Sequence, residues 1–182
     1  FFLYFPWAAP HTPIAPNDEY LGKSRAGKYG DFVVECDATV KRIVDVLKEK
    51  GFYENTIIIL TSDNGSSPHG FPIAQEIEFD HITSNGYKGR KSHSYEGGHR
   101  IPFIVSWPKK IAANTTSEET ICLTDFYATT ANLINHQLTS NEALDSYSFL
   151  PVLMGDEYSE PLREATVHHS LNGDFSIRKG DW

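Results

Sequence analysis

The sequence contains no run of about 18 consecutive apolar residues, so no transmembrane helix is expected. Basic residues are also scarce, because 16 Lys and Arg stand against 24 Asp and Glu and give a net charge of −8. Nucleic-acid binding needs a basic face, and the charge balance therefore argues against DNA or RNA as a partner. No signal peptide is visible, residue 1 lies within the apolar run "FFLYF", and residue 182 ends "FSIRKGDW", which predicts the start of a strand. We therefore expect an internal or C-terminal piece of a larger chain.

Cysteine is rare as well. Cys36 and Cys122 are the only two, and neither belongs to a C-x-x-C pair, so a zinc site is not expected. Their spacing leaves a disulfide open, and we favour the interpretation of two small, buried, apolar side chains. What is present is ordinary for a soluble globular domain: 182 residues, 40% of them hydrophobic. Nothing in this composition indicates an oligomeric state.

The hydrophobic pattern predicts a strand, a helix and a second strand, in that order. The apolar run that opens residues 1–10 predicts a buried strand, which ends at prolines. From about Gly30 to Lys50, apolar residues recur every three or four positions, and Gly51 suits the end of this helix. The segment "NTIIILTS" then predicts a strand covered on both faces. This βαβ order indicates an α/β fold with a mostly parallel sheet flanked by helices.

The rest of the chain alternates polar and apolar segments. Residues 63–100 form a long polar stretch, which a compact domain seldom carries unless the stretch is functional. We divide the chain into an α/β core to about residue 155 and the start of a C-terminal strand region at about 156–182. Within these parts the pattern predicts a strand at 101–108, a helix capped by Thr124 and running to about Asn135, a short buried segment "SFLPVLMG", and two strands around Asn172-Gly173.

Asp63 and Asn64 directly follow the apolar strand "IIILTS". A carboxylate and an amide carbonyl are hard oxygen ligands, which suit Ca²⁺ or Mg²⁺. The alternative is an Asx turn at a strand end, with Asn64-Gly65 supplying left-handed geometry. On spacing alone the turn is the simpler interpretation.

Two further polar clusters lie near predicted strands. His11 follows the first strand, and Lys91 belongs to the basic segment "GRKSHSYEGGHR" at 89–100. If the first two strands are parallel neighbours, His11 emerges at the same edge as Asp63, and the basic segment can fold back over that edge. Taken singly, an ordinary surface or hydrogen-bonded histidine and a solvated basic loop are the simpler interpretations.

Together these segments resemble a known family. "APHTPIAP", "TIIILTSDNGSS" and "KGRKSHSYEGGHRIPFIVSWP" are similar to the type I sulfatases of the alkaline-phosphatase-like superfamily, and "LTDFYATTANLI" follows in the family's order. The resemblance covers nearly the whole chain. It implies an alkaline phosphatase/sulfatase-like domain over residues 1–182 that is incomplete at both ends.

The resemblance also implies roles for individual residues. Asp63 and Asn64 fall on the family's "DNG" motif, whose acid and amide bind a divalent cation, usually Ca²⁺ and otherwise Mg²⁺. His11 falls on the histidine that contacts the sulfate ester and is a candidate proton donor to the leaving alcohol. Lys91 lies five residues before the Glu of "EGG", where the family's lysine contacts the sulfate.

Other matching positions are less directly involved. The segment "EGGHR" at 96–100 looks architectural. His168 and His169 lie where the family sometimes brings late polar residues near the substrate, and His169 is our candidate substrate-binding residue. The family's formylglycine nucleophile comes from a C/S-x-P/A-x-R motif, which this chain lacks. We expect that motif in a missing N-terminal part, and little or no activity from this chain alone.

The resemblance implies that the parent protein hydrolyses sulfate esters on a sulfated small molecule or glycan. One alternative is a phosphodiesterase or phosphonate hydrolase of the same superfamily, and another is a degenerate, non-catalytic binding relative. Similar bacterial enzymes are periplasmic or secreted, and similar eukaryotic ones are lysosomal or extracellular, so we expect one of these locations.

Overall fold

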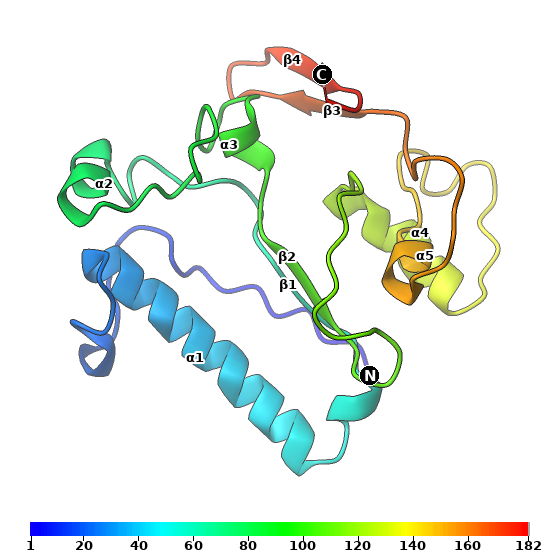
Figure 1. Cartoon of the computed structure of the whole chain (residues 1–182), viewed down its shortest axis with the longest axis horizontal. Helices are drawn as coiled ribbons and strands as arrows, with labels where there is room; N and C mark the ends of the chain where they lie inside the picture. The colour runs from blue at the N-terminus through cyan, green and yellow to red at the C-terminus, as the bar shows by residue number, and fades with distance from the viewer. Residues whose placement is uncertain (182) are drawn as a thin grey trace.

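The computed structural model describes residues 1–181 and places one long helix along one side of a group of shorter elements (Figure 1). None of the helices in this range is long and apolar enough to cross a membrane. The strands form two pairs, and three single turns of 3-10 helix precede or follow the longer elements. The helices are α1 (Gly27–Glu49), α2 (Ile73–Phe79), α3 (Glu96–His99), α4 (Phe126–Leu133) and α5 (Leu150–Met154), and the strands are β1 (Ile58–Thr61), β2 (Phe103–Ser106), β3 (Thr166–His169) and β4 (Phe175–Arg178).

The long helix α1 confirms the periodicity of its sequence and ends at the predicted glycine. Gly51 has φ +72°, a left-handed conformation that glycine adopts without a Cβ penalty. The amide of Gly51 donates to Lys48 O over 3.0 Å, and that of Phe52 donates to Leu47 O over 2.8 Å. This pair of bonds is the Schellman arrangement, which satisfies the last carbonyl groups of the helix.

The predicted mostly parallel sheet is not confirmed, because both sheets in residues 1–181 are antiparallel pairs. Thr61 lies opposite Phe103, and Ile58 lies opposite Ser106. The segment between β1 and β2 returns to the end of β1, so β2 starts where β1 stops and runs back. Residues 1–10 form no strand, contrary to our expectation, since no described strand pairs with them. The apolar side chains of residues 1–5 are accordingly exposed.

An aromatic cluster packs α4 and α5 against β2. The rings of Phe103, Phe126 and Phe149 lie with centroids 5.5–5.8 Å apart, and Phe149 is only 2% exposed. The predicted cap of α4 is wrong, because Thr124 instead donates its hydroxyl to Asp145 O. The predicted buried segment at 148–155 contains α5.

The predicted strand pair around Asn172-Gly173 is confirmed as the β3–β4 hairpin. Gly173 has φ +87°, and its amide donates to Ser170 O over 3.0 Å. The hairpin lies beside α3 in Figure 1. The division of the chain at about residue 155 stays a prediction.

Both cysteines are free and half-buried. Burial raises the pKa of the Cys36 thiol and of the Cys122 thiol. A raised pKa keeps a thiol neutral, which agrees with the interpretation of small apolar side chains.

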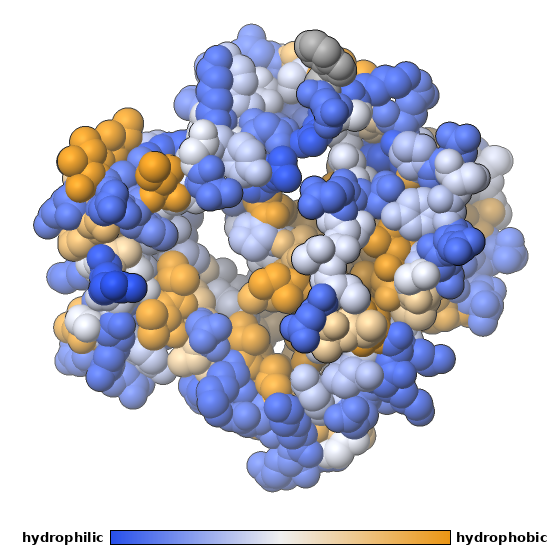
Figure 2. Space-filling model, viewed as in Figure 1, coloured by the Kyte–Doolittle hydropathy of each residue, from blue (hydrophilic) through white to orange (hydrophobic). Residues whose placement is uncertain are grey.

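Apolar side chains also gather over α2, at the left of the face shown in Figure 2. Ile73 and Ile77 of this helix are both exposed. The helix instead packs through Phe79, whose ring lies 6.3 Å from that of Phe71 and against Gly27 at the start of α1.

Candidate functional site

Two segments far apart in the sequence meet at one end of the β1–β2 pair (Figure 1). The amide of Gly65 donates to Gly98 O over 2.9 Å, and the amide of Lys91 donates to Ser66 O over 2.9 Å. The fold-back predicted for residues 89–100 is therefore confirmed. The backbone of Lys91 lies against the loop that begins with Asp63.

Glycines make this close approach possible. A Cβ on Gly65 would lie 1.9 Å from Gly97 O. A Cβ on Gly97 would lie 2.1 Å from Gly89 O, and one on Gly98 would lie 2.1 Å from His93 O. Each nearby atom belongs to the backbone, so it cannot rotate away. The glycines of the two motifs are required for their contact.

Asp63 and Asn64 present oxygen atoms at the end of β1. No hydrogen bond or ion pair within residues 1–181 engages the exposed Asp63 carboxylate. Asn64 Nδ2 donates to Gly65 O over 3.0 Å, which leaves its Oδ1 as an acceptor. Such oxygens fit a hard cation, but no group of three His, Cys, Asp or Glu in the described chain could hold one. The two residues can supply only part of a coordination shell, and their metal role stays a prediction.

The three neighbouring basic residues Lys88, Arg90 and Lys91 lie in different environments. Arg90 pairs with Glu76, and their side chains are only 12% and 13% exposed, so this arginine is structural. Lys88 lies over the ring of Tyr95, 3.9 Å from its centroid. The half-buried Lys91 forms no ion pair within residues 1–181. Neither lysine is paired with a carboxylate within residues 1–181, and Lys91 is the one whose backbone contacts the loop after β1.

His11 lies in an exposed turn of the Pro-rich loop. Its amide donates to Ala8 O over 2.8 Å, and its Nδ1 donates to Thr12 O over 2.7 Å, because a carbonyl oxygen can only accept. Nε2 is thus the ring nitrogen left for a ligand. The same loop approaches the segment after β1, since Ile14 Cδ1 would lie 3.8 Å from a Cβ on Gly70. The proton-donor role of His11 stays a prediction.

The late histidines are in different environments. His168 stacks on His99 with ring centroids 3.6 Å apart and planes 5° apart. Burial, followed by the charge of His99, lowers the pKa of His168. His169 is exposed, and its Nδ1 lies 3.0 Å from Ser170 O. Successive strand residues face opposite sides, so His168 and not His169 faces α3, and the substrate role of His169 stays a prediction.

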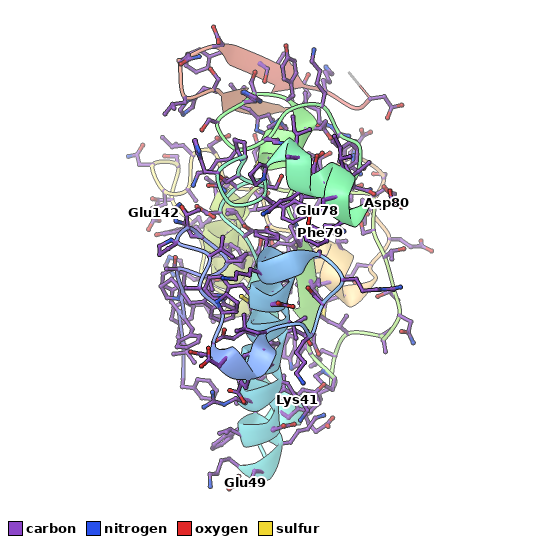
Figure 3. All side chains as sticks on the ribbon, turned by 90° about the vertical axis from the view of Figure 1, so that its left-hand side faces the viewer. Lys41, Glu49, Glu78, Phe79, Asp80 and Glu142 are labelled. Atoms are coloured by element: carbon purple, nitrogen blue, oxygen red, sulfur yellow. The ribbon has the colours of Figure 1, made fainter. Side chains whose placement is uncertain are left out.

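A hollow of about 450 Å³ lies between the start of α1 and the end of α2. Figure 3 shows Phe79 and Asp80 at the end of α2, close to α1. The lining residues are Arg25, Ala26, Phe79, Asp80 and His81, so none of the site residues predicted from the sequence belongs to this hollow.

Comparison with known proteins gives a consistent group of relatives. Residues 1–136 match the protein family described as Sulfatase. The N-acetylgalactosamine-6-O-sulfatase of Bacteroides thetaiotaomicron is 35% identical over the whole of this chain and 35% of its own length. The arylsulfatase of Hemicentrotus pulcherrimus is 40% identical over the whole chain and 31% of its own length. The chain spans about a third of the length of these curated relatives.

The fold agrees with the sequence matches. The solved PsFucS1 sulfatase from Pseudoalteromonas sp. superposes with a TM-score of 0.80 and 31% identity. The match covers 96% of this chain and 34% of the solved one. The arrangement described above is therefore shared with a solved sulfatase.

Proposed function

This chain belongs to the sulfatase family, and from that premise we propose that the full-length protein hydrolyses sulfate esters of glycans. Water replaces the alcohol at sulfur, the sulfur–oxygen bond to that alcohol breaks, and the leaving oxygen takes a proton. The observation that carries the proposal is the contact between the Lys91 segment and the end of β1. This contact places the backbone of Lys91 against Ser66, two residues after Asn64.

Four residues of this chain would bind the cation, bind the sulfate group and protonate the leaving oxygen. Asp63 and Asn64 would hold a Ca²⁺ or Mg²⁺ ion, whose positive charge polarises the sulfuryl oxygens. The Lys91 ammonium would bind a sulfate oxygen and stabilise the charge that shifts during cleavage. His11 would give the proton on Nε2 to the leaving oxygen, because its Nδ1 is occupied by Thr12 O.

The proposed substrate is a glycan bearing a 6-O-sulfated amino sugar. Its support is the relative named N-acetylgalactosamine-6-O-sulfatase, which matches the chain from end to end. The nucleophile is expected in the part of the parent protein outside residues 1–182, so the experiments below use the full-length protein.

The test compares sulfate and phosphate esters. Full-length protein is given N-acetylgalactosamine 6-sulfate, 4-nitrophenyl sulfate and bis(4-nitrophenyl) phosphate with CaCl₂, and product release is measured. We expect both sulfate esters to be cleaved faster than the diester. Preference for the diester would instead identify a phosphodiesterase, and cleavage of none of the three would contradict the proposed function.

A Lys91→Ala variant tests the site itself. Loss of the ammonium should lower kcat/KM for both sulfate esters by about 100-fold or more, the usual effect of removing a group that stabilises transition-state charge. Lys41→Ala is the matched control, because Lys41 is an exposed lysine on α1 that pairs only with Asp45 (Figure 3). Equal kcat/KM in the two variants would show that Lys91 does not take part in catalysis.

A further inference from the structure

The residue that follows Lys91 has a strained backbone. Ser92 has φ +79°, a conformation that residues other than glycine adopt only where their surroundings hold it. Its carbonyl accepts a hydrogen bond of 2.9 Å from the amide of Leu171, in the turn of the β3–β4 hairpin. On the other side, the amide of Lys91 donates to Ser66 O. Lys91 is thus fixed from two directions, one of which is the hairpin.

Two more contacts attach the hairpin to the same segment. Ser176 Oγ donates to Ser94 O over 3.2 Å, and Arg178 pairs with Glu96 over 2.7 Å. His99 Nε2 donates to the same Ser94 oxygen over 3.0 Å, so this carbonyl joins α3 to β4. The turn of the hairpin and strand β4 therefore take part in holding residues 92–99.

The stacked pair His99–His168 lies at the centre of this contact. The buried Thr166 hydroxyl lies 2.9 Å from His168 Nε2, and a positive charge on either ring would face the other at 3.6 Å. Arg178 on β4 and Arg163 before β3 add positive charge. Glu96 opposes them, but its carboxylate is already shared by Arg100 and Arg178.

We propose that the β3–β4 hairpin positions Lys91 through Ser92, and that the stack of a neutral His168 on His99 keeps the hairpin docked. Protonation of His168 undocks the hairpin and frees Ser92 from its left-handed conformation. His168 is in this sense a positioning residue, not a catalytic one. Its effect on turnover rests on the proposed function, whereas the docking does not.

The direction of the pH effect follows from proton linkage. Burial and then the charge of His99 lower the pKa of docked His168, whereas the undocked ring should titrate at its ordinary pKa of about 6.5. Docking is therefore unaffected above about pH 7. As the pH falls below about 6.5, only the undocked state takes up the proton, and docking weakens.

Hydrogen exchange of the full-length protein tests the docking without any turnover. The protection factor of the Leu171 amide, corrected for intrinsic exchange, is measured at pH 7.5 and pH 5. We expect it to fall at pH 5 by up to about 30-fold, because one proton linked over the 1.5 pH units below about 6.5 shifts an equilibrium by at most that factor. His136→Phe is the control, since His136 is exposed and lies in the segment between α4 and α5.

Two substitutions of His168 remove the positive charge that its ring would gain at low pH. His168→Phe keeps a ring for stacking, and His168→Gln keeps a partner for the Thr166 hydroxyl. Both should retain the Leu171 protection at pH 5. Wild-type protection that is equal at the two pH values would overturn the proposal, and so would variants as acid-sensitive as the wild type.

Turnover gives a second readout that a merely structural histidine would not alter. With 4-nitrophenyl sulfate, the acid limb of the kcat/KM profile should move to lower pH in both His168 variants, while His136→Phe keeps the wild-type limb. An unmoved limb would contradict the positioning role. Absence of turnover in every protein would contradict the proposed function and leave the exchange result to decide the docking.

Discussion

The amide of Gly65 donates to the carbonyl oxygen of Gly98 across 2.9 Å, so the turn after β1 and the helix before β2 touch through their backbones. The contact has no room for a side chain, because a Cβ on Gly65 would lie 1.9 Å from Gly97 O. This relationship determines where Lys91 lies with respect to Asp63. The geometry of the candidate site therefore depends on Gly65, Gly97 and Gly98, which have no functional side chain.

Gly65→Ala should separate the two segments. We expect a loss of about 1–3 kcal/mol in the free energy of unfolding, as for other overpacked sites, together with reduced sulfate ester hydrolysis. Urea unfolding of the full-length protein measures the first and a discontinuous assay the second. Gly70→Ala is the control, because its Cβ would meet nothing closer than 3.6 Å. Equal stability of the two variants would contradict the steric argument.

Removing the carboxylate of Asp63 should abolish cation binding. In the wild-type full-length protein, Ca²⁺ at about 100 times its Kd should stabilise the fold by about 2.7 kcal/mol, seen as a rise in Tm. Asp63→Ala should show no rise. Glu78→Ala, at an exposed acid on α2 (Figure 3), should keep the full rise. If neither Ca²⁺ nor Mg²⁺ changes the Tm of the wild-type protein, Asp63 and Asn64 are not ligands of either cation.

His11→Ala should affect substrates according to their leaving groups. An acidic phenol leaves readily without a proton, whereas a sugar alcohol needs one, so the loss should be small for 4-nitrophenyl sulfate. For a sugar sulfate it should reach about 10²–10⁴-fold, the usual contribution of general acid catalysis. The measurement is kcat/KM across a series of leaving-group pKa values. Losses of equal size along the series would exclude His11 as the acid.

Arg163 and Asp125 form a buried ion pair of 2.5 Å, with side chains 3% and 1% exposed. The same carboxylate accepts the amides of Cys122 and Tyr147 over 2.7 and 2.8 Å. Arg163→Met leaves this charge unpaired and should cost about 3–5 kcal/mol in urea unfolding.

The matched control for this prediction is Lys179→Met, which breaks an exposed pair with Glu164. An exposed pair contributes at most about 1 kcal/mol, so this variant should unfold close to the wild type. A similar cost in both variants would show that burial of the Arg163–Asp125 pair has no special effect.

Features set by neighbouring residues could be predicted from the sequence. The end of α1 at Gly51 and the hairpin turn at Gly173 depend on backbone preferences of a few residues, and both are found. The strand of residues 58–61 was likewise evident from its apolar run. The close approach of the "DNG" and "EGG" segments was predicted only as a fold-back, without the glycine contacts that form it.

Features set by pairing over long distances could not be predicted. Residues 1–10 have the composition of a strand, but a strand also needs a neighbour, which the described chain does not supply. The direction of β2 depends on where its preceding loop docks, and no local pattern encodes that. His99 was overlooked because its importance lies in a ring 3.6 Å away on another element.

The hairpin contacts also set an order of events during biosynthesis. Ser94 and Ser176 are 82 residues apart. A ribosome adds about 5–20 residues per second, so the loop beside Lys91 waits at least about 4 s for its partner to emerge. The bonds of that loop to Gly65 and Ser66 do not involve the hairpin and can form earlier in translation. A nascent chain halted before the hairpin would carry the Lys91 ammonium on a loop held only by residues that precede the hairpin, and the site therefore matures only after residue 176 has been synthesised.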